Sequence, residues 1–174
     1  MSQLPFQIIG FDLDGTLLET HRDLGAAVNH ALELGGFEKV PADHASDLIG
    51  GGAKIMLMRA VDEQGGLPEE KFRKLYKAML AFYAENNAVH TRPYPNAAEV
   101  LADLDDRGIA MVVVTNKFES FAAEILDQLG LSNRFVTLIG GDSLGKDAEG
   151  NFRAKPSADP IHAAIERCGS QSFA

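Results

Sequence analysis

A short apolar run near the N-terminus ends abruptly in a polar turn that contains a glycine. The run covers residues 6–11, and the turn that follows reads Asp-Leu-Asp-Gly-Thr over residues 12–16. A continuous apolar run bounded by turn residues predicts a buried strand of a parallel sheet. Ligands of such sheets bind outside the carboxyl ends of the strands, so the same pattern predicts a polar site directly after residue 11.

The rest of the chain divides into a helical stretch and an alternating stretch. From Thr20 to about Val89 the apolar residues follow helical spacing without a strand signal, and helices are expected at 20–34, 42–48, 53–63 and 69–85. Beyond residue 95 the expected helices (95–107, 118–129, 157–168) alternate with β-branched or apolar runs (110–115, 135–139). Such alternation predicts a parallel sheet covered on both faces. We therefore predict an α/β core that is interrupted by an all-helical insert.

Two local patterns carry more specific expectations. Thr20 with Asp23 three residues later resembles a capping box at the start of the first helix. The segment 145–153 forms a long loop before Lys155, either as a small hairpin or, the interpretation we favour, as a plain surface loop.

Composition and charge exclude several classes of protein. The 174 residues are 45% hydrophobic with a formal net charge of −9, which is ordinary for a globular domain and unfavourable for binding nucleic-acid phosphate. The densest basic stretch, 71–77, is interleaved with acidic and apolar residues, as on a solvated helix face. No apolar run approaches the ~18 residues of a membrane span, and residues 1–5 lack the features of a signal peptide. Cys168 is the single cysteine and cannot form an internal disulfide, which favours a reducing cytoplasm. We expect neither a nucleic-acid nor a membrane partner, and the oligomeric state stays open.

Polar residues with complementary chemistry follow the predicted strands. Asp12 and Asp14 come after the first strand, Thr115 and Asn116 after the strand 110–115, and Lys155 precedes the last helix. Two carboxylates one residue apart repel each other unless a cation such as Mg²⁺ balances them. Asp12 could then attack phosphorus as a nucleophile, and Asp14 could protonate the leaving alcohol and activate water. Thr115, Asn116 and Lys155 would hold the phosphoryl oxygens. The alternative is that both aspartates only shape a turn. Asp142, after the strand 135–139, is a further candidate for facing the same cleft.

These strings resemble the sequence motifs of a known superfamily. Residues 12–17 (Asp-Leu-Asp-Gly-Thr-Leu), 113–116 (Val-Val-Thr-Asn) and 155–156 (Lys-Pro) are similar to motifs I, II and III of the haloacid dehalogenase superfamily. Further strings at 48–53, 83–87, 92–95, 114–117 and 140–143 resemble phosphoglycolate phosphatases, and the resemblance runs from Phe6 to the last residue.

The resemblance implies a Rossmann-like parallel-sheet core with an inserted helical C1 cap. It places the core at 1–18 and 91–174 and the cap at 19–90. It further implies Mg²⁺-dependent hydrolysis of a small-molecule phosphate monoester through an aspartyl-phosphate, with 2-phosphoglycolate as the first expected substrate. Asp12 would bind the metal by its side chain and Asp14 by its backbone carbonyl. Relatives continue into further metal-binding carboxylates, and we expect this chain to stop at the start of the strand before them, which leaves the core incomplete at its C-terminus.

Two other functions stay open at this point. Dehalogenases of this type carry Tyr at the position of Asp14 and phosphonoacetaldehyde hydrolases carry Ala, so Asp14 favours a phosphatase. Lys54 nevertheless lies about where the Schiff-base lysine of phosphonoacetaldehyde hydrolases would fall. Gly52, Lys54 and Arg59 are therefore candidate cap residues that contact the substrate. The second possibility is a truncated, non-catalytic fragment that folds and binds phosphate without assembling the metal site.

Overall fold

The structure, a computed structural model, describes residues 5–41 and 52–169 and divides into two compact units. Unit 1 comprises Met1–Leu18 and Pro93–Ala174, and unit 2 comprises Glu19–Arg92. The short strands β2 (Leu18–Glu19) and β3 (Arg92–Pro93) pair with each other and contain the two points where the chain passes between the units. Sequence analysis found no signal for these strands, because a strand of two residues is too short to show periodicity.

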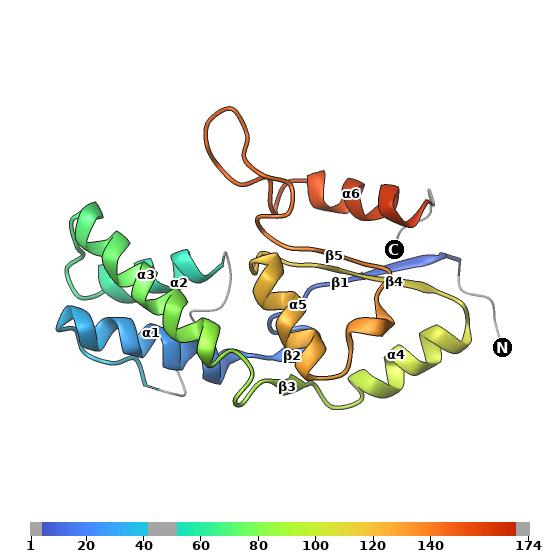
Figure 1. Cartoon of the computed structure of the whole chain (residues 1–174), viewed down its shortest axis with the longest axis horizontal. Coiled ribbons are helices and arrows are strands. Elements are labelled where there is room, and N and C mark those ends of the chain that lie inside the picture. The colour runs from blue at the N-terminus through green and yellow to red at the C-terminus, as the bar shows by residue number, and fades with distance from the viewer. Residues whose placement is uncertain (1–4, 42–51, 170–174) are drawn as a thin grey trace. The chain divides into compact units, whose positions relative to one another are not determined.

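Unit 1 is built on a parallel sheet of three strands. The strands are β1 (Ile8–Phe11), β4 (Ala110–Val114) and β5 (Thr137–Ile139), in the order β1-β4-β5 (Figure 1). All four residues of the β4 segment 111–114 are buried, as expected for a central strand with both faces covered.

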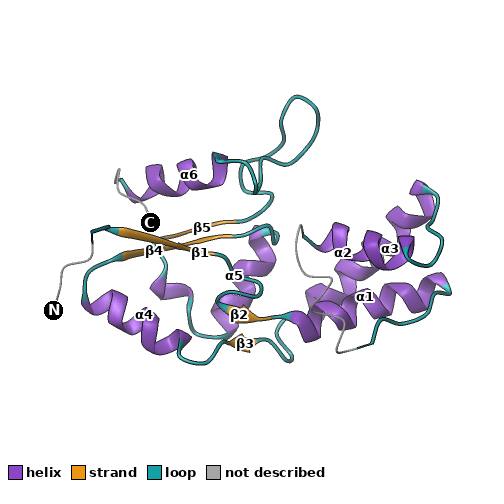
Figure 2. Cartoon of the chain, turned by 180° about the vertical axis from the view of Figure 1, so that it is seen from behind, coloured by secondary structure: helices purple, strands orange, loops and turns teal. Residues whose placement is uncertain are grey.

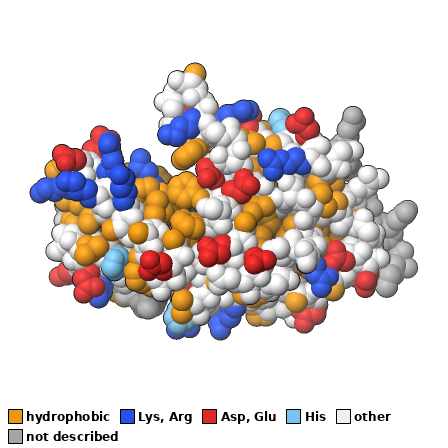
Figure 3. All heavy atoms as spheres, in the orientation of Figure 1, with side chains coloured by type: hydrophobic (Ala, Val, Ile, Leu, Met, Phe, Trp, Pro, Cys, Tyr) orange, Lys and Arg blue, Asp and Glu red, His pale blue; other side chains and the backbone are white. Residues whose placement is uncertain are grey.

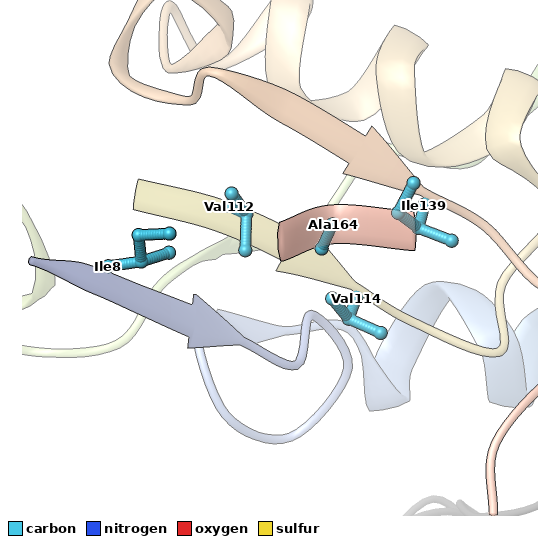
Figure 4. Close-up of a cluster of buried hydrophobic side chains, with 5 residues drawn as sticks. All are labelled: Ile8, Val112, Val114, Ile139 and Ala164. Atoms are coloured by element: carbon cyan, nitrogen blue, oxygen red, sulfur yellow. The ribbon is translucent and has the colours of Figure 1, made fainter. Parts of the chain in front are cut away.

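Helices cover both faces of this sheet. Helix α6 (Asp159–Cys168) lies on one face, and α4 (Ala97–Asp106) and α5 (Glu119–Gln128) lie on the other (Figures 1 and 2). A 3₁₀ turn, η2 (Ser132–Arg134), connects α5 to β5. Side chains from all three strands meet α6 in a buried cluster that Figure 4 shows, formed by Ile8, Val112, Val114, Ile139 and Ala164.

In its described residues, 19–41 and 52–92, unit 2 contains helices and connecting turns apart from its ends in β2 and β3. Its helices are α1 (His21–Gly35), α2 (Ala53–Asp62) and α3 (Glu69–Glu85), and α1 contacts both of the others. The basic residues of 71–77 are exposed on α3, where lysine and arginine side chains gather at the surface (Figure 3). Arg73 and Lys74 pair with glutamates four residues earlier, at 2.9 and 3.2 Å, as on a solvated helix face.

The expected capping box at the start of α1 is wrong. Thr20 occupies the N-cap position without a side-chain hydrogen bond to the helix. Asp23 is buried and instead accepts hydrogen bonds from the backbone N–H groups of His90 and Thr91 and from Thr91 Oγ1. The acidic residue therefore holds together the two ends of unit 2, a contact across 67 and 68 residues that no local pattern reveals.

The segment 145–153 closes as a small hairpin, so the plain loop that we favoured is wrong. An antiparallel bridge joins Lys146 to Phe152, and Asp147 accepts hydrogen bonds from the backbone N–H groups of Glu149 and Asn151. The Phe152 ring packs edge-on against Phe118 at 6.1 Å between centroids.

The structure confirms the α/β class, with a parallel-sheet core and a helical insert. The expected helix at 42–48 and the glycines at 50 and 51 lie outside the described residues. Within 5–41 and 52–169, no helix combines the length and apolar character that crossing a membrane requires.

Candidate active site

The carboxyl ends of the parallel strands bring the predicted site residues of unit 1 to one edge of the sheet. Phe11 is in register with Val113, so Asp12 and Thr115 follow neighbouring strands at nearly the same level. Val114 is in register with Ile139, which brings the turn after β5 to the same edge. The sequence expectation of a polar site at these strand ends therefore agrees with the sheet register.

Asp12 is held from two sides. Its Oδ1 accepts a hydrogen bond from the backbone N–H of Leu13 and lies 2.8 Å from Lys155 Nζ. The Asp12 side chain remains 42% exposed, so a ligand can reach it. A carboxylate that is fixed in orientation and still accessible suits a nucleophile.

The turn after Asp12 is fixed by its own backbone. The carbonyl of Leu13 accepts hydrogen bonds from the N–H groups of Leu17 and Leu18, and Gly15 takes φ +75°, which side chains other than glycine rarely adopt. The N–H of Gly15 donates to the carbonyl of Leu18 and completes a bridge between Asp14 and Leu18, and no backbone N–H of the described residues donates to the carbonyl oxygen of Asp14. The turn thus sets the position of Asp14 rigidly relative to Asp12.

The Asp14 side chain faces a lysine that sequence analysis did not single out. Asp14 Oδ1 lies 3.0 Å from Lys117 Nζ, and the Lys117 side chain is only 4% exposed. The available signal was weak: Lys117 follows Thr115 and Asn116 directly after β4, but a lysine at this place is usually exposed.

Thr115 and Asn116 extend the site from the end of β4. The N–H of Thr115 donates to the carbonyl of Ile139 at 2.9 Å, and Thr115 Oγ1 accepts a hydrogen bond from the N–H of Lys117. Asn116 Nδ2 donates to the carbonyl of Lys155 at 3.2 Å, which ties the loop before α6 to this strand end. Asn116 Oδ1 is buried and has no hydrogen-bond partner among the described residues, so it is available to a ligand.

The turn after β5 holds the segment that follows β4 in place through hydrogen bonds. Asp142 Oδ1 accepts a hydrogen bond from the N–H of Glu119 at 2.8 Å, so this carboxylate caps the first turn of α5. The N–H of Gly141 donates to the carbonyl of Lys117, and a Cβ at Gly141 would lie 2.6 Å from the carbonyl oxygen of Asn116. Glycine is therefore required here because two backbones approach closely.

The candidate cap residues lie together on one helix of unit 2. Gly52 precedes the first turn of α2 with φ 90°, and Lys54 and Arg59 are exposed on that helix. Their role in substrate binding stays a prediction.

The oxygen donors of the site fit a hard cation such as Mg²⁺. The Asp12 carboxylate is accessible, and neither the carbonyl of Asp14 nor the buried Asn116 Oδ1 accepts a hydrogen bond from the described part of the chain. Mg²⁺ usually takes one or two carboxylates and keeps several waters, so this small set is sufficient to begin a site. Within the part of the chain that the structure describes, no three His, Cys, Asp or Glu side chains gather as a ready-made metal site.

The chain is similar to known proteins over most of its length. The family model described as haloacid dehalogenase-like hydrolase matches residues 6–173. Phosphoglycolate phosphatases of Agrobacterium fabrum and Neisseria gonorrhoeae are both 37% identical to this chain, over 160 and 165 residues that cover 91% and 94% of it. The chain spans about two thirds of these relatives, 66% and 67% of their lengths.

A solved structure gives the same result for the fold. The crystal structure of a predicted phosphoglycolate phosphatase from Haemophilus somnus 129PT superposes with a TM-score of 0.84 at 32% identity, covering 98% of this chain and 74% of that one. This similarity covers nearly the whole chain, including the strand ends that carry Asp12, Asp14 and Thr115 and the loop before α6 that carries Lys155. The chain belongs to the haloacid dehalogenase-like hydrolase family, and it is phosphoglycolate phosphatase-like within that family.

Proposed function

We propose that this protein is a Mg²⁺-dependent phosphomonoester hydrolase that acts through an aspartyl-phosphate on 2-phosphoglycolate or a similar small phosphorylated acid. One observation carries the proposal. Asp12 and Asp14, two residues apart at the end of β1, each face the ammonium group of a different lysine, at 2.8 Å for Lys155 and 3.0 Å for Lys117. Removing two lysine ammonium groups from water is unfavourable, and the shape of the turn alone does not require it.

In the first step Asp12 attacks phosphorus. One carboxylate oxygen of Asp12 forms a bond to phosphorus while the bond between phosphorus and the substrate's ester oxygen breaks. Asp14 gives its proton to that oxygen, so the product leaves as an alcohol. The hydrogen bond from the N–H of Leu13 to Asp12 Oδ1 restricts rotation of the Asp12 carboxylate. The nucleophile is therefore held in one orientation for attack.

In the second step water releases the phosphate. Asp14 takes a proton from the water, whose oxygen bonds to phosphorus as the bond from phosphorus to Asp12 breaks. The Asp12 carboxylate is restored and inorganic phosphate leaves. The Thr115 hydroxyl, the Asn116 side chain and the Lys155 ammonium group would hold the phosphoryl oxygens through both steps.

The charges of the site support a divalent cation. Lys155 balances the Asp12 carboxylate, and when Asp14 carries the proton that it gives to the leaving oxygen, Lys117 supplies a single positive charge. The doubly charged phosphate of a substrate would therefore enter only partly compensated. Asp12, by its side chain, and Asp14, by its backbone carbonyl, would hold Mg²⁺. When bound, the ion supplies positive charge to the phosphoryl oxygens and to the nucleophile's surroundings.

The substrate assignment comes from the relatives. Those in Agrobacterium fabrum and Neisseria gonorrhoeae are described as phosphoglycolate phosphatases. A substrate carboxylate would need a cation, and the exposed Lys54 and Arg59 on α2 are the candidates that the sequence offers. We disfavour cleavage of a carbon–phosphorus bond through a Schiff base on Lys54, because that reaction does not need the acid and base that Asp14 supplies.

Phosphate release tests the proposal. The protein is incubated with 2-phosphoglycolate, sugar phosphates and nucleoside monophosphates, with Mg²⁺ or with EDTA, and phosphate is measured over time. We expect release that requires Mg²⁺ and is fastest with 2-phosphoglycolate. A borohydride-trapped adduct on Lys54, or release that EDTA does not affect, would contradict the proposal.

A further inference from the structure

Lys117 is a buried cation that the proposed chemistry does not yet use. Its side chain is 4% exposed, and its Nζ lies 3.0 Å from Asp14 Oδ1. A lysine is rarely buried to this degree, because its ammonium group loses hydration that only a well-placed partner replaces. The contact with Asp14 offsets part of this cost.

The backbone of Lys117 is anchored on both sides. Its N–H donates to Thr115 Oγ1 at 3.2 Å, and its carbonyl accepts from the N–H of Gly141 at 2.8 Å. Gly141 packs so closely against the carbonyl of Asn116 that this loop has little freedom to move. The turn after β5 and the end of β4 thus fix the position from which the Lys117 side chain reaches Asp14.

Asp14, in contrast, depends on this contact for its orientation. Its Oδ1 is buried, and apart from Lys117 Nζ no donor among the described residues lies within hydrogen-bonding reach of it. The turn around Gly15 fixes the backbone of Asp14 but leaves the carboxyl group free to rotate about its side-chain bonds.

We propose that Lys117 is a positioning residue that holds the Asp14 carboxyl group where it exchanges protons with the leaving oxygen and with the attacking water. This inference rests on the proposed function. It gives Lys117 a role different from that of Lys155, which is 27% exposed and faces the nucleophile Asp12. Lys155 acts on the phosphoryl group itself, whereas Lys117 acts only through Asp14.

The two roles predict different kinetics with two kinds of substrate. An alkyl ester such as 2-phosphoglycolate leaves as a poor alkoxide and needs the proton of Asp14. An aryl ester such as p-nitrophenyl phosphate leaves as a stabilised phenolate and does not. The parameter kcat/KM reports events up to the transfer of phosphate to Asp12, and kcat also includes release of phosphate from Asp12.

The experiment compares Lys117→Met with wild type on both substrates. For 2-phosphoglycolate we expect kcat/KM to fall by about 10- to 100-fold, a part of what a positioned acid or base contributes. For p-nitrophenyl phosphate we expect kcat/KM to change by less than about threefold, while kcat falls because the attacking water still needs Asp14. The matched control, Lys155→Met, should lower kcat/KM for both substrates alike.

A double-mutant cycle isolates the connection to Asp14. In an Asp14→Asn background, Lys117→Met should add little further loss, because the group it positions is already gone. Circular dichroism and thermal unfolding check that the variants fold. If Lys117→Met does not fold, Lys117→Arg replaces it, because arginine keeps the positive charge but places it differently. This variant should again lose more kcat/KM on 2-phosphoglycolate than on p-nitrophenyl phosphate, by a smaller factor.

Three results would overturn the inference. Equal loss of kcat/KM on both substrates would make Lys117 a phosphate-binding or purely structural residue. Additive losses in the double mutant would show that it acts independently of Asp14. Wild-type protein that releases phosphate from neither ester would remove the proposed function itself, and this inference with it.

Discussion

The buried carboxylate of Asp23 offers a quantitative test of how unit 2 is held together. Asp23 is 2% exposed and accepts hydrogen bonds from three donors: His90 N at 2.9 and 3.0 Å, and Thr91 N and Thr91 Oγ1 at 2.8 Å each. These contacts join the start of α1 to the segment that leads into β3. Replacing Asp23 with Ala would leave all three donors without their acceptor.

The cost follows from the exposure of each donor. A buried donor that loses its partner costs about 1–3 kcal/mol. His90 is exposed, so its N–H regains water, but Thr91 is buried and cannot. We therefore expect Asp23→Ala to lower the free energy of unfolding by about 3–5 kcal/mol, more than most single substitutions. Thr91→Val removes only the hydroxyl donor and keeps a side chain of similar shape, so it should lower the free energy of unfolding by about 1 kcal/mol.

Urea unfolding followed by tyrosine fluorescence measures this effect. The chain has no tryptophan and three tyrosines, of which Tyr76 and Tyr83 lie in α3, so the signal reports mainly on unit 2. Glu70→Ala is the matched control, because Glu70 is an exposed acidic residue paired with Lys74 and should change stability by less than about 0.5 kcal/mol. An Asp23→Ala variant within about 1 kcal/mol of wild type would refute the reasoning, since one unsatisfied buried donor alone costs that much.

Three further predictions concern unit 1. Asp14→Asn should slow both loss of the leaving group and hydrolysis of the phosphorylated enzyme, by about 10²-fold or more in kcat, and normal turnover would refute its role as acid and base. Gly141→Ala places a Cβ 2.6 Å from the carbonyl oxygen of Asn116, so we expect about 1–3 kcal/mol of destabilisation in thermal unfolding and a lower kcat; an unchanged melting temperature would contradict the close approach. Burial raises the pKa of the Cys168 thiol, so less reactive thiolate is present at neutral pH and alkylation by iodoacetamide should accelerate only above the pH range of an ordinary cysteine. Alkylation as fast as that of a small free thiol would refute this, and Cys168→Ser should leave phosphate release unchanged.

The sequence predicted the elements of the core because each has a strong local signal. The apolar run before Asp12 and the β-branched run before Thr115 became β1 and β4, and parallel pairing places their carboxyl ends at one edge. The identity of the polar residues after the strands was enough to propose Asp12, Asp14, Thr115 and Lys155 together, although no sequence pattern states their distances.

The features that sequence analysis missed depend on contacts between distant residues. Asp23 has the spacing of a capping residue, yet its partners lie at His90 and Thr91, and this long-range contact outweighs the local pattern. The pairing of Lys117 with Asp14 likewise depends on the packing of β1 beside β4. The hairpin at 145–153 has a single bridge between its two arms and a contact of Phe152 with Phe118. Neither feature produces a repeating pattern of apolar residues that sequence analysis could detect.

The most direct test of the central claim is whether Asp12 carries the phosphoryl group during turnover. The protein would be mixed with 2-phosphoglycolate and Mg²⁺, quenched in acid within the first turnovers, digested, and analysed by mass spectrometry. We expect one phosphoryl group on the peptide that contains Asp12, removed by hydroxylamine, and none in the Asp12→Asn variant, which should also release no phosphate. Phosphate release without any phosphorylated Asp12, or turnover by Asp12→Asn above a few per cent of wild type, would contradict it.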